Sequence, residues 1–175
     1  AALGIDGDMA YLSSNVPELL DGGLRLVDIG PGVGRYMLVA RELGNTVSGE
    51  ELPIHSSEYI AAYSKITNYW GLDINYCGFD KRITDKSLPY DDETIDIFHF
   101  RGSLDGVLVQ HMSNINAIMK DMLFILHKAL KKNGIIFIMH NVDKLLDAIT
   151  QSIRSNCSQF NVVIDEKSTT KLVKR

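Results

Sequence analysis

The sequence predicts an α/β three-layer sandwich, in which helices cover both faces of a mostly parallel sheet. Short apolar segments alternate with helical segments along most of the chain, a pattern typical of parallel strands joined by crossover helices. The segment 135–140 is the most apolar of them, as expected for a strand in the middle of such a sheet. The last two strands, at 160–165 and 169–174, have only a short turn between them. Because a parallel return needs about a dozen residues or more, these two predict an antiparallel terminal hairpin.

We expect a short leader followed by one domain. Residues 1–23 form the leader, with a helix at 16–20 that Asp21, Gly22 and Gly23 end. Residues 24–175 form the domain, because a domain has roughly 100–200 residues and the whole chain has 175. In its first half, strands and helices alternate: a strand at 24–29, a helix at 35–43, a strand at 46–49, a helix at 54–70 and a strand at 74–79.

The second half of the domain begins with a polar loop that runs to Asp92. The expected elements that follow are a strand at 95–100, a helix at 114–132 stopped by Asn133 and Gly134, the strand at 135–140, a helix at 142–155 and the hairpin.

Composition excludes several classes of protein. Apolar residues make up 45% and charged residues 23% of the chain, close to the average for soluble domains, which excludes disordered, collagen-like and coiled-coil chains. No apolar stretch approaches the roughly 18 residues of a membrane span, and no charged-then-apolar segment predicts export. The two cysteines, Cys77 and Cys157, are too few for a disulfide scaffold and lack metal-ligand spacing. We therefore expect a reducing, cytoplasmic location, with no membrane contact and no bound metal.

The charge of the chain does not indicate a nucleic-acid partner. The net charge is −4, so no overall field attracts a polyanion. Four basic residues near the end of the chain predict a solvated face: Lys167, Lys171, Lys174 and Arg175.

A glycine-rich turn joins the first expected strand to the helix after it. Gly30, Gly32 and Gly34 stand at alternate positions, so the chain can turn sharply and expose backbone N–H groups at the start of a helix. A dinucleotide fingerprint would place its third glycine one residue later, where Arg35 stands, and no Gly-Lys-Ser/Thr of a P-loop follows. The turn therefore indicates a small-molecule site, and its spacing disfavours binding of a pyrophosphate. A plain structural turn is the alternative.

An acidic pair ends the next strand. Glu51 stands seventeen residues after Gly34, where a carboxylate can accept hydrogen bonds from the two hydroxyls of a ribose. Glu50 would serve instead if the strand ended one residue earlier. A solvated acidic pair before Pro53 is the alternative without function.

Four segments in order carry a family resemblance: VDIGPGVGR at 27–35, VSGEEL at 47–52, LPYDDETIDI at 88–97 and HKALKKNG at 127–134. Through them, residues 24–140 resemble the class I S-adenosylmethionine-dependent methyltransferases, of the kind grouped as methyltransferase types 11 and 25. The resemblance implies a Rossmann-like sheet of seven strands in the order 3-2-1-4-5-7-6. It also implies S-adenosylmethionine as the cofactor, with S-adenosylhomocysteine as its product.

The resemblance also implies roles for single residues. The turn would hold the methionine end of the cofactor through Gly30, Pro31, Gly32 and Gly34, with Asp28 supporting it. Glu51 would bind the ribose, and Leu52 would lie against the adenine. Either Asp80 or Asp85 would meet the adenine amino group, and Asp85 is favoured because it stands three residues before Leu88.

Polar residues at the ends of the fourth and fifth strands are candidates for chemistry, because ligands sit at that edge of an open α/β sheet. His140 is the best placed to act as a general base, with a structural histidine as the alternative. His99 lies inside an expected strand, so we expect it in the core. Arg101 is expected to be a cofactor-binding residue. It could equally meet a carboxylate or phosphate of the acceptor, or pair with Asp96 or Asp105.

The methyl acceptor is not indicated by the sequence. No large insertion follows the fourth or fifth strand, so we expect an open site or one completed by a partner protein. Two other functions are alternatives to a methyltransferase. One is a non-catalytic module with the same fold, and the other is an NAD-dependent oxidoreductase, which Arg35 disfavours.

Overall fold

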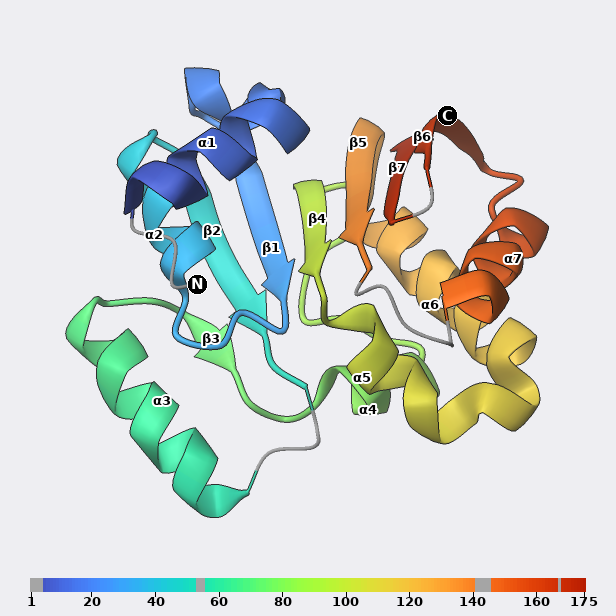
Figure 1. Cartoon of the computed structure of the whole chain (residues 1–175), viewed down its shortest axis with the longest axis horizontal. Helices are drawn as coiled ribbons and strands as arrows, with labels where there is room; N and C mark the ends of the chain where they lie inside the picture. The colour runs from blue at the N-terminus through green and yellow to red at the C-terminus, as the bar shows by residue number, and fades with distance from the viewer. Residues whose placement is uncertain (1–4, 53–55, 141–145, 167) are drawn as a thin grey trace.

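A mixed β-sheet forms the middle layer of the molecule (Figure 1). A computed structural model describes residues 5–52, 56–140, 146–166 and 168–175, and within these ranges seven strands pair in the order β3-β2-β1-β4-β5-β7-β6. All pairs are parallel except those that β7 makes with β5 and β6. The strands are β1 (Arg25–Ile29), β2 (Thr46–Glu50), β3 (Ile74–Asn75), β4 (Ile95–Arg101), β5 (Leu130–Met139), β6 (Phe160–Asp165) and β7 (Thr169–Lys174). The predicted fold class, strand order and terminal hairpin are confirmed.

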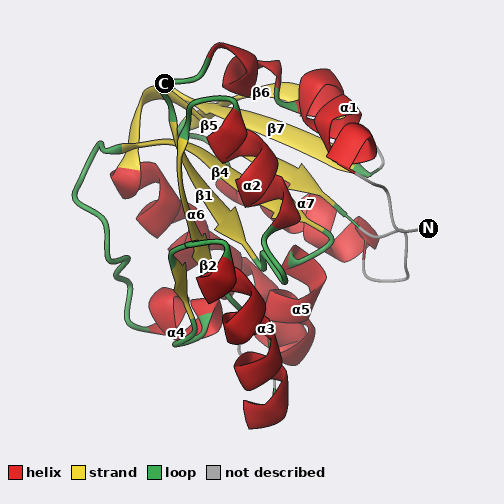
Figure 2. Cartoon of the chain, turned by 90° about the vertical axis from the view of Figure 1, so that its left-hand side faces the viewer, coloured by secondary structure: helices red, strands yellow, loops and turns green. Residues whose placement is uncertain are grey.

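Helices cover both faces of this sheet, as Figure 2 shows with α1 on one side and α6 on the other. The first face carries α1 (Ile5–Asn15), the 3-10 helix η1 (Pro17–Asp21) and α2 (Arg35–Glu42). The second face carries α4 (Phe79–Thr84), α5 (Leu104–Leu108), α6 (Ile115–Ala129) and α7 (Leu146–Asn156), with the 3-10 helix η2 (Val109–Asn114) between α5 and α6. Helix α3 (Ser57–Tyr69) lies beyond the β3 edge (Figure 1).

Side chains of the central strands alternate between the two faces, and this alternation positions the candidate site. In β1, Val27 and Ile29 pack in the core under α6, whereas Leu26 packs in the core under α1 and α2. In β4, Phe98 faces α6 and Ile97 faces α1. Since successive strand residues point to opposite faces, Asp28 of β1 and His99 of β4 fall on the α1 side.

The leader is part of the core of the first face. Tyr11, Leu12, Val16 and Leu19 are all buried there. The helix predicted at 16–20 corresponds to η1, and α1 before it was not predicted. Glycine and serine within α1 lower its intrinsic helix propensity, and burial of its apolar side chains against the sheet stabilises it instead.

Several predicted boundaries are wrong. The strand expected at 74–79 ends at Asn75, and the expected polar loop contains α4. Gly78 has a φ of 96° and turns the chain, so that Phe79 is fully buried, with its ring 5.9 Å from that of Phe100. The helix expected to reach residue 132 ends at Ala129, because Leu130 is fully buried and already pairs with β4.

The predicted solvated face at the C-terminus is also wrong in part. Lys171 and Lys174 are 7% and 8% exposed, because β7 lies inside the sheet between β5 and β6. Lys167 and the span 141–145, where most of the first turn of the helix expected at 142–155 falls, lie outside the described residues.

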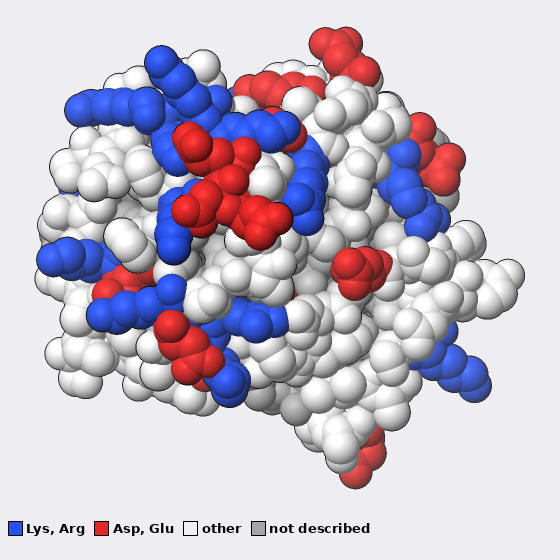
Figure 3. Space-filling view, turned by 180° about the vertical axis from the view of Figure 1, so that it is seen from behind, with Lys and Arg blue, Asp and Glu red and all other residues white. Residues whose placement is uncertain are grey.

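The charged surface seen from behind carries basic and acidic side chains side by side (Figure 3). The ion pairs of the described residues include Lys128 with Asp92 (3.9 Å) and Lys131 with Asp96 (3.2 Å). None of the helices that the structure describes combines the length and the apolar character needed to cross a membrane.

Candidate functional site

The glycine-rich turn leaves the carboxyl end of β1 and leads into α2. Gly30, Gly32 and Gly34 have φ values of 73°, 58° and 81°, a region that residues with a Cβ enter only with strain. The Gly30 N–H donates to the Glu50 carbonyl at 2.8 Å, and the Gly34 N–H donates to the Pro31 carbonyl at 2.9 Å. The turn is therefore fixed by its own backbone against the end of β2.

The two sides of this turn differ in how much room they leave. A Cβ added to Gly30 would lie 2.6 Å from the Cβ of Ser103, so the turn touches the start of α5 there. A Cβ added to Gly32 would meet no atom of the described residues within 4 Å. Ser103 is 4% exposed, and its Oγ has no hydrogen-bond partner within the described part of the chain. The turn thus combines space above Gly32 with a buried polar atom beside Gly30.

Glu51 directs its carboxylate at the turn. Its Oε2 accepts the Gly32 N–H at 3.1 Å, its Oε1 accepts the Leu52 N–H at 2.8 Å, and the residue is 2% exposed. The acid that the sequence places after the second strand therefore lies next to the glycine turn. Leu52 follows it and is 3.4 Å from the Cβ that Gly30 would carry.

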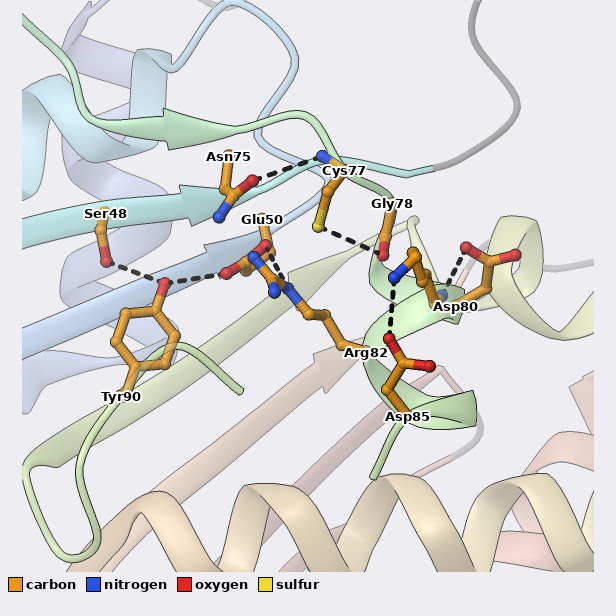
Figure 4. A network of polar contacts seen from close by, with 10 residues as sticks. Ser48, Glu50, Asn75, Cys77, Gly78, Asp80, Arg82, Asp85 and Tyr90 are labelled. Carbon is orange, nitrogen blue, oxygen red and sulfur yellow. Dashed lines mark hydrogen bonds and ion pairs between the residues drawn. The ribbon is translucent and has the colours of Figure 1, made fainter. Parts of the chain in front are cut away.

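Glu50 faces the opposite side of the sheet and is already engaged (Figure 4). The Tyr90 hydroxyl donates to its Oε1 at 3.3 Å, and the Arg82 Nε lies 3.6 Å from its Oε2. Ser48 completes the cluster, with its Oγ 3.2 Å from the Tyr90 hydroxyl. Burial raises the pKa of Glu50, and the neighbouring Arg82 guanidinium opposes that rise. Of the two acids, only Glu51 faces the turn.

The two candidates for the adenine amino group lie at opposite ends of α4 (Figure 4). The Phe79 N–H donates to the Glu51 carbonyl at 3.0 Å, so the first turn of α4, which contains Asp80, lies beside the end of β2. Asp85 follows the last turn and pairs with Lys81, with a distance of 2.9 Å between Nζ and Oδ2. Asp80 is therefore the candidate on the side of the glycine turn.

Asp28 belongs to a buried chain of polar side chains. Its Oδ1 lies 3.1 Å from Nδ1 of His99, and Nε2 of His99 lies 3.0 Å from the hydroxyl of Tyr11. All three residues are buried, which confirms the core position predicted for His99. Burial raises the pKa of Tyr11, although the charge of Arg101 opposes the rise. The Oδ2 of Asp28 is buried and has no hydrogen-bond partner among the described residues.

Tyr11 was missed by sequence analysis, because it comes from a helix that was not predicted. It contacts His99 across 88 positions of the chain, and no local pattern signals a contact of that length.

Arg101 ends β4 on the same face as Tyr11. Its guanidinium carbon lies 4.1 Å from the centre of the Tyr11 ring and 4.5 Å from that of Tyr36, the second residue of α2. The pairing with Asp96 considered above is wrong, because Asp96 accepts from the Arg25 N–H at 2.8 Å and pairs with Lys131 at the other end of the strand.

His140 directly follows β5, at the same edge of the sheet as the glycine turn. It is 4% exposed, and its backbone N–H donates to the Ser168 carbonyl at 2.8 Å. The described residues contain no group of three or more His, Cys, Asp or Glu side chains able to hold a metal ion. The site therefore offers backbone donors, carboxylates and a histidine.

Solved structures of S-adenosylmethionine-dependent methyltransferases share this fold. A methyltransferase from Mesorhizobium loti has a TM-score of 0.59 at 16% identity, over 98% of this chain and 100% of its own. One from Aquifex aeolicus has a TM-score of 0.56 at 14% identity, over 98% of each chain. One from Methanosarcina mazei has a TM-score of 0.59 at 13% identity, over 90% of this chain and 94% of its own. No protein-family model and no curated protein sequence matches the chain. The chain thus has the Rossmann-like fold found in these methyltransferases.

Proposed function

We propose that the chain binds S-adenosylmethionine and transfers its methyl group to an acceptor. The observation that carries the proposal is the convergence of the Glu51 carboxylate and the glycine turn, joined by the 3.1 Å hydrogen bond from Gly32. This convergence lies at the carboxyl edge of a parallel sheet, where open α/β folds bind ligands. The methyltransferase neighbours share the same fold over nearly their whole length.

The described residues fit the nucleoside end of this cofactor. A carboxylate has about four acceptor positions, so Glu51 can bind ribose hydroxyls while it holds the Gly32 N–H. Leu52 would lie against the adenine, and Asp80, on the first turn of α4, is better placed than Asp85 to accept from the adenine amino group. No described atom lies within 4 Å of a Cβ built on Gly32, so a ligand atom would find room there.

The methionine end fits the other side of the turn. Backbone N–H groups at the start of α2 would face it, with Ser103 Oγ as a further partner. The unpartnered Oδ2 of Asp28 is suited to the positively charged amino group.

Methyl transfer makes limited demands on this chain. When bound, the cofactor supplies a methyl group on a sulfonium that the acceptor displaces in line. The residues of the site then have to align the two molecules and exclude water. His140 would accept a proton from the acceptor where the acceptor carries one.

Calorimetric titration tests the proposal. We expect S-adenosylhomocysteine to bind and NAD not to bind, because Arg35 stands where the dinucleotide turn needs glycine. Replacing Glu51 by Ala should weaken S-adenosylhomocysteine binding by about 1–3 kcal/mol, since the ribose hydroxyls lose a buried partner. Glu42→Ala, at an exposed acid that ends α2, is the matched control and should bind like the wild type.

The outcomes separate the alternatives. Binding of NAD in preference to S-adenosylhomocysteine would favour an oxidoreductase. Equal affinity in Glu51→Ala and the wild type would remove Glu51 from the site. Binding without methyl transfer to any candidate acceptor would favour a non-catalytic module.

A further inference from the structure

Arg101 packs against two aromatic rings that lie next to each other. Its guanidinium carbon lies 4.1 Å from the centre of the Tyr11 ring and 4.5 Å from the centre of the Tyr36 ring. The two rings are 5.2 Å apart and inclined by 50°. Contacts of this kind hold the guanidinium by cation–π attraction. Tyr11 is itself held by His99, so the arrangement is built before any ligand arrives.

Arg101 is the second feature of this arrangement, because it lacks an ion-pair partner in the part of the chain that the structure describes. Within the described ranges no carboxylate forms an ion pair with it, and its Nη1 is buried without a hydrogen-bond partner. Three other arginines have carboxylate partners: Arg35 has Asp8 at 2.8 Å, Arg82 has Glu50 at 3.6 Å and Arg154 has Asp165 at 2.7 Å. A buried guanidinium N–H without a partner is unfavourable, and its planar fork matches a carboxylate in two places.

Arg101 also lies in line with the proposed cofactor site. It ends β4, Glu51 follows β2, and β1 with its glycine turn lies between these two strands. Two strand spacings amount to roughly 10 Å. A ligand with its ribose at Glu51 that runs along the turn therefore reaches Arg101 with its far end.

We propose that Arg101, held against Tyr11 and Tyr36, is a carboxylate-binding site. The assignment rests on the proposed function, because its place in the site follows from the nucleoside end at Glu51. The carboxylate belongs either to the amino-acid end of the cofactor or to the methyl acceptor beside it. Both sources present the same chemistry to the guanidinium, and two arms of one experiment distinguish them.

The first arm compares S-adenosylmethionine with decarboxylated S-adenosylmethionine, which lacks only the carboxylate. We expect the wild type to prefer the complete molecule by about ten-fold or more, as the loss of a charge-assisted hydrogen bond implies. Arg101→Met should lose this preference, and Arg101→Lys should keep part of it. Arg25→Met is the matched control, since Arg25 also stacks on a tyrosine, Tyr90 at 5.5 Å, but begins β1 at the opposite edge of the sheet. It should keep the full preference.

The second arm titrates malonate into the chain saturated with S-adenosylhomocysteine. Where the wild type binds both nucleosides equally, malonate binding that Arg101→Met abolishes would assign the site to the acceptor. If neither the nucleoside preference nor malonate binding depends on Arg101, the inference is overturned. If no nucleoside binds to the wild type, the proposed function fails. Titration of malonate into the chain alone then shows whether Arg101 binds a carboxylate. Circular dichroism establishes that each variant is folded before it is titrated.

Discussion

The Oδ1 of Asp28 lies 3.1 Å from the Nδ1 of His99, across the two strands at the centre of the sheet. Both side chains are almost completely excluded from solvent. The other ring nitrogen of His99 reaches the hydroxyl of Tyr11 at 3.0 Å, so this one histidine links β1, β4 and α1. The leader is thereby fixed to the strand that ends at the glycine turn.

Replacing His99 by Phe should therefore destabilise the fold. Phe keeps the ring that stacks on Phe137 at 5.9 Å but leaves the Asp28 carboxylate and the Tyr11 hydroxyl buried without this partner. We expect a loss of about 2–4 kcal/mol in the free energy of unfolding, measured by urea denaturation. His111→Phe, at a half-buried histidine in η2, is the control and should change it little.

A triple variant tests the cause of that loss. Asp28→Leu and Tyr11→Phe, added to His99→Phe, remove the two polar groups that lose their partner in the single variant. The triple variant should recover much of the lost stability, because an apolar replacement of a complete buried network is often close to neutral. A triple variant that is less stable than His99→Phe would show that the polar chain is not the cause.

Glu50 should make the stability of the chain depend on pH. Burial raises its pKa above the ordinary value of 4.5, so the folded state holds its proton to higher pH than the unfolded state does. The free energy of unfolding then falls as the pH rises from about 4.5 through the raised pKa. Glu50→Gln lacks this titration, so its stability relative to the wild type should increase over that range. Urea denaturation at several pH values measures the difference, and a difference independent of pH would contradict the prediction.

Lys174 should stabilise the end of α6. Its Nζ donates to the carbonyls of His127 at 2.8 Å and Leu130 at 2.7 Å, which lie at the helix end where carbonyls have no helical partner. Lys174→Met should reduce the free energy of unfolding by about 1–3 kcal/mol, because both acceptors lose a buried donor. Lys132→Met removes an exposed lysine and should leave the free energy of unfolding nearly unchanged. Equal values for the two variants would exclude a stabilising role for the Lys174 contacts.

The sequence predicts correctly those elements whose position depends only on their own residues. The hairpin strands occur at 160–165 and 169–174 as predicted, because their alternation and the short turn are local properties. The shortness of β3 depends instead on burial of Phe79 against Phe100, a tertiary contact. The inward position of Lys174 likewise depends on which strands flank β7, which the residues of β7 do not encode.

The candidate site divides in the same way. Topology alone brings the ends of β1 and β2 together, so the glycine turn and the acidic pair could be expected to meet. The choice between Glu50 and Glu51 needs the face to which each side chain points, and Tyr90 and Arg82 occupy the face of Glu50. The contact between Arg101 and Tyr11 could not be expected, because Tyr11 comes from a leader helix that local propensity does not favour.

Gly32 and Gly23 provide a matched pair for the glycine turn. Both have a positive φ, 58° and 77°, and a Cβ on either would meet no atom of the described residues within 4 Å. Gly32→Val and Gly23→Val should therefore carry a similar backbone strain of about 1–2 kcal/mol, and both should fold. Of the two, only Gly32 donates its N–H to the Glu51 carboxylate, and its new side chain would fill the space proposed for the ligand. We expect calorimetry to show S-adenosylhomocysteine binding abolished in Gly32→Val and retained in Gly23→Val. Retained affinity in a folded Gly32→Val would place the ligand away from this turn.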